Sequence, residues 1–216
     1  ASLLQAVKTR MAGGKKVVAI QPHAREEEFE PMKVQSFGER TRAFVKIQDG
    51  CERFCSYCII PFARGPVRSK TLEDLREELE DLVKAGYREV VLVGINLSSY
   101  GTDLGYRLLD AITLADSVDG IQRVRLGSLE PELLSKEDIA SMAKLESFCP
   151  QFHLSLQSGS VAVLERMRRP YTIPEYRRIV TDLRDAFENP AITTDIMVGF
   201  PEETKEEHEE SLAFVK

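Results

Sequence analysis

Apolar residues follow two alternating spacings along residues 43–216. Short apolar runs rich in β-branched residues, typical of strands covered on both faces, alternate with longer segments whose apolar residues recur every three or four positions, as on one face of a helix. This alternation predicts repeated strand–helix units around a parallel sheet. We predict five strands, at residues 43–48, 89–95, 123–127, 151–156 and 192–198.

Helices are expected between these strands. The clearest begins after Thr71, an N-cap with Asp74 three residues later, and ends at Gly86. Further helices are predicted at residues 105–117, 135–145, 174–187 and 204–216, the third of them with Pro174 in its first turn. The expected fold class is α/β, an open parallel sheet with flanking helices.

Residues 1–42 do not follow this pattern. They contain one amphipathic helical stretch at residues 1–10, a break at Gly13 and Gly14, and an irregular acidic segment at residues 26–30. We interpret residues 1–42 as the tail of a preceding domain and a linker, and residues 43–216 as the main domain. The last helical pattern reaches the final residue without a stop signal, so we expect this domain to be truncated at its carboxyl end.

Composition and net charge add only broad limits on the class of protein. The chain has 216 residues, 43% of them hydrophobic and 30% charged, which suits one globular domain. It contains no apolar run of membrane-spanning length and no signal peptide, so we expect a cytoplasmic protein that contacts no membrane. The net charge of −6 does not indicate nucleic-acid binding, and any such contact would be local.

Three of the four cysteines form a CxxxCxxC motif at Cys51, Cys55 and Cys58, in a long loop after the first predicted strand. In parallel α/β folds, ligands bind beyond the carboxyl ends of the strands. Three thiolates can hold a four-iron cluster and leave one iron open to a small molecule. Structural zinc is the alternative, but it needs four ligands, and no histidine has a zinc-like spacing from the trio. A purely structural cluster is a second alternative.

Polar residues and glycines follow the later strands in the same way. Gly94 would let a backbone approach a ligand, and Asn96 offers an amide to a carboxylate or an amine. Each such residue alone is equally compatible with a turn or a helix cap. Their recurrence at successive strand ends favours one ligand pocket. The further candidates at strand ends are Ser128, Glu130, Gln157, Ser158, Asp195 and Gly199.

The cysteine motif, with the aromatic Tyr57 before its third cysteine, resembles the radical S-adenosylmethionine (SAM) superfamily. The resemblance implies a partial TIM-type (βα) barrel with a radical SAM core, a [4Fe–4S] cluster held by the three cysteines, and SAM chelated on the open iron. An electron donor would then drive SAM cleavage to a radical that abstracts hydrogen from carbon. The cofactor pocket implied comprises Tyr57, Gly94, Asn96, Ser128, Glu130, Gln157, Ser158, Arg169, Asp195, Met197 and Gly199.

Several further segments resemble the methylthiotransferases of this superfamily, which insert sulfur and a methyl group at a C–H bond. They are residues 44–51, 58–65, 68–69, 167–172 and 199–204. Residues 94–101 and 153–159 are most similar to the branch that modifies C2 of N6-threonylcarbamoyladenosine at position 37 of tRNA. The alternatives are methylthiolation of isopentenyladenosine tRNA or of a ribosomal protein, and a non-catalytic, metal-stabilised RNA-binding module.

The resemblance also implies parts that this sequence does not contain. Family members carry a second cluster in an amino-terminal domain and an RNA-binding β-barrel at the carboxyl end. We therefore expect tRNA contacts to lie mainly outside this chain, and the chain alone to be unable to complete the reaction. One position departs from the family pattern, because Glu202 stands where a glycine is usual.

Overall fold

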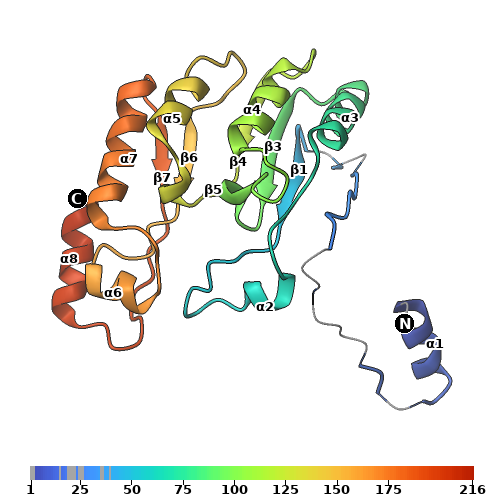
Figure 1. Cartoon of the computed structure of the whole chain (residues 1–216), viewed down its shortest axis with the longest axis horizontal. Coiled ribbons are helices and arrows are strands. Elements are labelled where there is room, and N and C mark those ends of the chain that lie inside the picture. The colour runs from blue at the N-terminus through green and yellow to red at the C-terminus, as the bar shows by residue number, and fades with distance from the viewer. Residues whose placement is uncertain (1–2, 15, 19–22, 24–26, 35–36, 39) are drawn as a thin grey trace.

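The computed structural model describes residues 3–14, 16–18, 23, 27–34, 37–38 and 40–216. The main body is an α/β fold with a curled sheet and helices along its outer side (Figure 1), which confirms the predicted fold class. The strands are β1 Arg42–Asp49, β2 Arg68–Ser69, β3 Glu89–Gly94, β4 Arg123–Leu126, β5 Ser128–Leu129, β6 Gln151–Leu154 and β7 Ala191–Thr193.

Helices α3, α4, α5 and α7 contact one another in that order along the sheet (Figure 1). The α-helices are α1 Leu3–Met11, α2 Ile60–Arg64, α3 Leu72–Lys84, α4 Leu108–Ser117, α5 Lys136–Met142, α6 Val161–Arg166, α7 Ile173–Ala186 and α8 Lys205–Val215. Two short 3₁₀ helices, η1 Leu97–Ser99 and η2 Pro131–Leu133, follow β3 and β5. None of the described helices is both long and apolar enough to cross a bilayer.

The strands are arranged in the orders β2-β1-β3-β4 and β5-β6-β7, and every pairing is parallel except that of β1 with β2. Gly127 alone separates β4 from β5, and its N–H donates to the Leu92 carbonyl at 2.9 Å. At this point the chain leaves β3 and pairs with β6. An isolated bridge between Val124 and Phe148 also joins the two groups. This change of partner curls the sheet into part of a barrel.

The helix starts confirm the predicted capping signals. The Thr71 side chain accepts the backbone N–H of Asp74 at 3.1 Å at the start of α3. Thr172 caps α7 reciprocally with Glu175, and Pro174 lies in the first turn. Each cap satisfies a backbone donor that has no partner within the helix. The sequence analysis missed the short helices α2 and α6, which have fewer residues than a periodic pattern needs to be recognised.

The last predicted strand, at residues 192–198, is wrong in its length. β7 ends at Thr193, and only an isolated bridge from Ile196 to Gln157 follows. The Thr194 hydroxyl accepts the Leu156 N–H at 3.0 Å and donates to the Leu154 carbonyl at 2.6 Å, so a side chain replaces the ladder. Asp195 therefore lies after the strand rather than within it, and 78% of its side chain is exposed.

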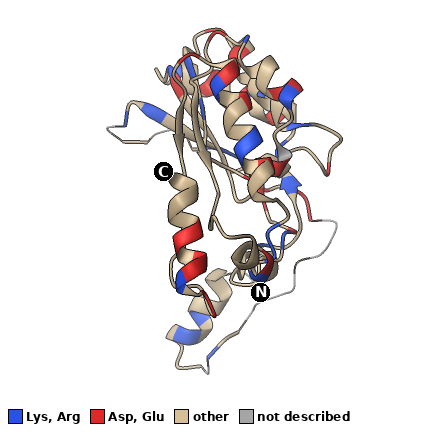
Figure 2. Cartoon of the chain, turned by 90° about the vertical axis from the view of Figure 1, so that its left-hand side faces the viewer, with Lys and Arg blue, Asp and Glu red and all other residues tan. Residues whose placement is uncertain are grey.

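Helix α1 buries none of its residues and lies apart from the curled sheet (Figure 1). Among the described residues of the segment that follows, Lys33 forms an ion pair with Glu77 of α3 at 3.0 Å. The division of the chain at residue 42 stays a prediction. Figure 2 shows acidic and basic residues interspersed over the helices, with acidic residues gathered in the first turns of α8.

Candidate active site at the strand ends

The cysteine loop, residues 50–58, is fixed against the end of α6. The backbone N–H of Ser56 donates to the Met167 carbonyl at 3.1 Å, and its hydroxyl donates to the Arg166 carbonyl at 2.8 Å. These carbonyls belong to the last turn of a helix, where no intrahelical N–H reaches them. The Cys58 N–H donates to the Cys55 carbonyl at 3.0 Å and closes the turn between the two cysteines.

The three thiols differ in their surroundings. Cys55 is buried, whereas Cys51 and Cys58 are partly exposed, and none of the three forms a disulfide. Burial raises the pKa of the Cys51 thiol, and hydrogen bonds from the Arg53 backbone and the Asn96 amide act in the opposite direction. The Cys55 Sγ accepts a hydrogen bond from Arg169 Nη1 at 3.3 Å. Each of these two sulfurs therefore has a hydrogen-bond donor within reach.

Within the described residues, no three His, Cys, Asp or Glu side chains converge as ligands of a single ion would. An iron–sulfur cluster binds each thiolate through a different iron, so its ligands lie farther apart than the ligands of a single ion. The identity of Cys51, Cys55 and Cys58 as cluster ligands stays a prediction.

Gln48 organises the ends of β1 and β3. Its side-chain oxygen accepts the Asn96 N–H at 2.7 Å, and its amide nitrogen donates to the carbonyls of Asp49 and Gly50 at 2.7 and 2.8 Å. A Cβ atom at Gly94 would lie 2.8 Å from the Gln48 oxygen, so a glycine is required there. The sequence analysis attributed Gly94 to a ligand and missed Gln48, although a polar amide in an apolar strand was the available signal.

Asn96 is only 5% exposed and faces the cysteine loop. Its Nδ2 lies 3.8 Å from the Cys51 Sγ, and its Oδ1 is buried without a hydrogen-bond partner. An unpaired buried acceptor costs about 1–3 kcal/mol, so such groups usually mark a position completed by something else. The side-chain Oδ1 of Asn96 is thus available to a ligand that donates hydrogen bonds.

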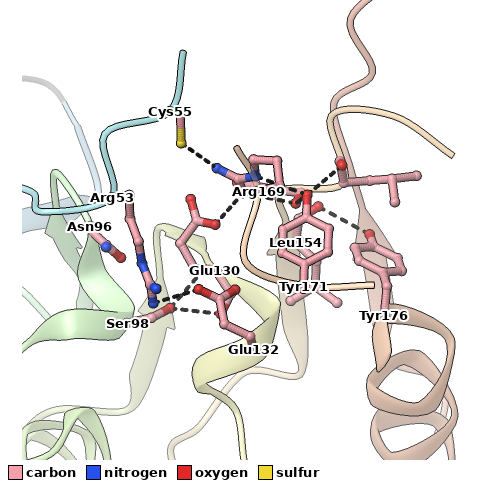
Figure 3. A network of polar contacts seen from close by, with 12 residues as sticks. Arg53, Cys55, Asn96, Ser98, Glu130, Glu132, Leu154, Arg169, Tyr171 and Tyr176 are labelled. Atoms are coloured by element: carbon pink, nitrogen blue, oxygen red, sulfur yellow. Dashed lines mark hydrogen bonds and ion pairs between the residues drawn. The ribbon is translucent and has the colours of Figure 1, made fainter. Parts of the chain in front are cut away.

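Glu130 and Arg169 form an ion pair between the end of β5 and the segment after α6 (Figure 3). The Glu130 N–H donates to the Ser98 hydroxyl at 2.8 Å, which ties the β5 end to η1. The Arg169 side chain is 3% exposed. Burial alone would lower the pKa of Arg169, but Glu130 and Tyr171 together hold it above its ordinary value, so the guanidinium stays charged.

A second ion pair, which the sequence analysis missed, joins the cysteine loop to η2. Arg53 Nη2 lies 2.6 Å from Glu132 Oε1 (Figure 3). Burial raises the pKa of Glu132, and the Arg53 charge opposes that rise. Nothing local in the sequence indicates this pair, since its members are far apart along the chain. The pair anchors the cysteine loop at a second point.

Gln157 and Ser158 follow β6, as predicted, but their surroundings differ. Gln157 has a positive φ of 65°, and its N–H and carbonyl bond to Asp195 and Met197. Ser158 is fully buried, and its hydroxyl lies 3.1 Å from the Ser211 hydroxyl of α8. In this structure the Ser158 side chain therefore positions α8, and a ribose contact there stays a prediction.

Aromatic and apolar contacts complete the site near α8. The Tyr57 and Phe200 rings meet edge to face with centroids 6.1 Å apart, and burial raises the pKa of Tyr57 to about 12. Met197 packs against a group of buried apolar side chains that includes Phe200. Gly199 has a φ of 73°, and the space where its Cβ would be is open. The ligand roles of these residues, and of the exposed Ser128, stay predictions.

Glu202 has a φ of 66°, in the left-handed region that glycine adopts most easily. This conformation explains why a glycine suits the position, and it shows that the backbone keeps the turn with glutamate there. Strained φ values of this kind also occur at Phe54, Gln157 and Arg168, around the same site. Such strain is often concentrated at functional sites.

Comparison with known proteins shows which family the chain resembles. The model of the radical SAM superfamily matches residues 45–215. A threonylcarbamoyladenosine tRNA methylthiotransferase from Thermotoga maritima is 42% identical over 84% of the chain, which covers 42% of that relative. The same kind of enzyme from Aquifex aeolicus is 38% identical over 99% of the chain and 52% of the relative. A tRNA-2-methylthio-N(6)-dimethylallyladenosine synthase from Clostridium botulinum is 41% identical over 81% of the chain and 39% of that relative.

Solved structures share the fold at low sequence identity. The radical SAM methyltransferase TsrM from Kitasatospora setae matches 81% of the chain and 34% of its own length, with a TM-score of 0.65 and 18% identity. The cobalamin-dependent radical enzyme OxsB matches 79% of the chain and 26% of its own length, with a TM-score of 0.63 and 12% identity. The curled sheet, the cysteine loop at its strand ends and the match over residues 45–215 lead to one conclusion: the chain belongs to the radical SAM superfamily.

Proposed function

We propose that this chain is the radical SAM part of a tRNA methylthiotransferase that acts on C2 of N6-threonylcarbamoyladenosine at position 37. The observation that carries the proposal is the meeting of the cysteine loop with Asn96, Glu130 and Arg169 at the strand ends (Figure 3), in a chain 38–42% identical to such enzymes. The cofactors are a [4Fe–4S] cluster and SAM. When bound, they supply a carbon-centred radical able to remove hydrogen from an unactivated C–H bond.

Cys51, Cys55 and Cys58 are the proposed cluster ligands. Thiolates are the ligands that iron–sulfur clusters use most, and three of them leave one iron open. The hydrogen bonds that reach Cys51 and Cys55 support this assignment, because donors to sulfur stabilise metal-bound thiolate. The docking of Ser56 on α6 and the Arg53–Glu132 pair hold the loop in place around them.

Asn96 is the proposed contact for the ammonium group of the methionine part of SAM. Its Oδ1 is a buried acceptor without a partner, and an ammonium carries three donors. Glu130 adds a carboxylate on the same side, where a positive ligand would be favoured. The remaining proposed pocket residues are Tyr57, Gly94, Ser128, Gln157, Ser158, Arg169, Asp195, Met197 and Gly199.

The surroundings of the site are suited to radical chemistry. A carbon radical reacts with whatever it meets, so the protein must position the substrate and exclude water. The burial of Phe200 and the largely buried ion pairs at Glu130 and Glu132 support such shielding. No side-chain base is needed for hydrogen abstraction itself.

The proposed identity of the modified tRNA base rests on two short segments of the sequence. Both kinds of tRNA methylthiotransferase match this chain with nearly equal identity, 42% and 41%. Residues 94–101 and 153–159 favour the threonylcarbamoyladenosine branch over the isopentenyladenosine and ribosomal-protein branches. A tRNA substrate also places the reaction in the cytoplasm. Nucleoside mass spectrometry of tRNA from a deletion strain separates the three, because the two tRNA branches predict the loss of different modified nucleosides and the ribosomal-protein branch predicts no loss from tRNA.

The chain spans about half the length of the curated relatives it matches. We propose that residues 1–42 connect the radical SAM domain to a domain with a second cluster, and that most tRNA contacts lie outside this chain. The acidic balance of the chain supports this division, because phosphate binding needs local positive charge. An electron donor is a further required partner.

Anaerobic reconstitution of the purified chain tests the radical assignment directly. With iron, sulfide, SAM and a reductant, we expect 5′-deoxyadenosine from the wild type and none from a Cys55→Ala variant. The partly buried Cys149, which lies outside the cysteine motif, provides the matched control, since Cys149→Ala should leave the product unchanged. A wild type that takes up a cluster but yields no 5′-deoxyadenosine would favour the alternative of a metal-stabilised RNA-binding module.

A further inference from the structure

The backbone after α6 directs Arg169 toward the cysteine loop. Helix α6 ends with Arg168 in the left-handed conformation, at a φ of 58°. The N–H groups of Arg168 and Arg169 donate to the carbonyls of Glu165 and Leu164, both at 2.9 Å. This is the hydrogen-bond pattern of a Schellman motif, in which the chain reverses direction. As a result, Arg166 reaches Glu207 on α8, whereas Arg169 lies beneath Cys55.

The Arg169 guanidinium is then fixed by contacts from several sides (Figure 3). Its Nη1 donates to the Cys55 Sγ at 3.3 Å, its Nη2 pairs with Glu130, and its Nε donates to the Tyr171 hydroxyl at 3.2 Å. The Tyr171 ring also lies beneath the guanidinium, 4.9 Å away. Tyr171 in turn donates to the Leu156 carbonyl at 2.5 Å. The direction of the Arg169 N–H toward the sulfur is therefore set by the end of β6.

A charged donor at a cluster thiolate has a defined electronic effect. The reduced cluster carries more negative charge than the oxidised one, so a cation hydrogen-bonded to a ligand sulfur stabilises the reduced state. Burial strengthens this interaction, because little water screens it. The Glu130 carboxylate pairs with the same guanidinium, and its negative charge acts to lower the reduction potential.

We propose that Arg169 is a positioning residue that raises the reduction potential of the cluster through Cys55, and that Glu130 moderates this effect. The proposal rests on the [4Fe–4S] site proposed above. It adds a role toward the cluster to the place of Arg169 in the proposed pocket. It also makes Tyr171 a support whose hydroxyl and ring keep the guanidinium aimed at the sulfur.

The test is a reductive titration of the reconstituted chain, followed by electron paramagnetic resonance of the reduced cluster without SAM. Arg169→Gln should shift the midpoint potential to a more negative value, because a cation is lost. Glu130→Gln should shift it to a more positive value. Arg166→Gln is the matched control, since its guanidinium faces Glu207, and it should leave the potential unchanged.

Arg169→Lys is a second variant, which keeps the proposal testable if Arg169→Gln does not fold. It keeps the buried charge beside Glu130, but an ammonium lacks the fork that reaches both the carboxylate and the sulfur, so a smaller negative shift is expected. Potentials that do not move, or that move in the same direction in Arg169→Gln and Glu130→Gln, would overturn the proposal while leaving the proposed function intact. A wild-type chain that binds no cluster would overturn both.

Discussion

The side-chain oxygen of Gln48 accepts the backbone N–H of Asn96 at 2.7 Å, across the carboxyl ends of β1 and β3. This bond fixes the backbone of Asn96, whose Nδ2 lies 3.8 Å from the Cys51 Sγ and whose side-chain Oδ1 has no hydrogen-bond partner. It also occupies the volume that a side chain at Gly94 would need. A contact inside the sheet thereby sets the geometry of the site above it.

Gly94→Ala should destabilise the fold by about 1–3 kcal/mol, because overpacking a filled site forces neighbours to move. The new Cβ would lie 2.8 and 2.9 Å from two atoms of the buried Gln48 side chain. Urea unfolding measures the change. Gly127→Ala is the matched control, since its Cβ would meet no described atom closer than 3.5 Å, and it should unfold nearly as the wild type does. Equal losses in both variants would contradict the prediction.

Glu202→Gly should stabilise the protein, by up to about 1 kcal/mol. Residue 202 has a φ of 66°, where a side chain is strained, and this gain exceeds the entropy that glycine adds to the unfolded chain. Thermal unfolding measures the difference. The same substitution at Glu209, in the middle of α8, should instead destabilise by about 1 kcal/mol. A lower melting temperature for Glu202→Gly would show that the glutamate side chain makes a compensating contact.

The Glu207 carboxylate should make stability depend on acid pH. Hydrogen bonds from Arg166 and from the Thr204 backbone lower the pKa of Glu207 to about 2. A group whose pKa is lower in the folded state stabilises above its unfolded pKa of about 4.3, and loses this effect as pH falls toward the folded value. The wild type should therefore melt above Glu207→Gln at pH 7, with the gap closing between about pH 4.3 and 2. Glu210→Gln serves as the control on the same helix.

Arg53→Leu should destabilise the chain by about 3 kcal/mol, because it leaves the Glu132 carboxylate buried without its partner. The double variant Arg53→Leu with Glu132→Leu should recover most of that loss. Unfolding free energies of the four proteins form a double-mutant cycle. The exposed pair of Lys84 and Asp81 is the comparison, and Lys84→Leu should change stability by less than about 1 kcal/mol. Additive effects of Arg53 and Glu132 would contradict the coupling.

Features that depend on neighbours along the chain could be predicted from the sequence. The cap at Thr71 and the strand that leads to Cys51 follow from spacings of a few residues. The pairs Arg53–Glu132 and Ser158–Ser211 could not be predicted, because each joins residues brought together only by the folded sheet. The overlong strand at residues 192–198 has a different cause, since its apolar pattern continues past Thr193.

Arg169 was predictable from the sequence as a residue of interest, but its contacts were not. The resemblance to the radical SAM superfamily placed Arg169 in the predicted cofactor pocket. The direction of its side chain depends on the φ of Arg168 and on Tyr171, which no spacing rule encodes. Arg169 therefore stays a predicted pocket residue, whereas its contacts with Cys55, Glu130 and Tyr171 could be assigned only from the folded structure.

The docking of Ser56 on the last turn of α6 spans 110 residues of sequence. During synthesis from the amino terminus, the cysteine loop leaves the ribosome well before the helix that anchors it. The thiols are then accessible to oxygen and to stray metal ions while the chain is still being made. Cluster insertion into an anchored loop therefore requires that the chain has been synthesised at least as far as α6.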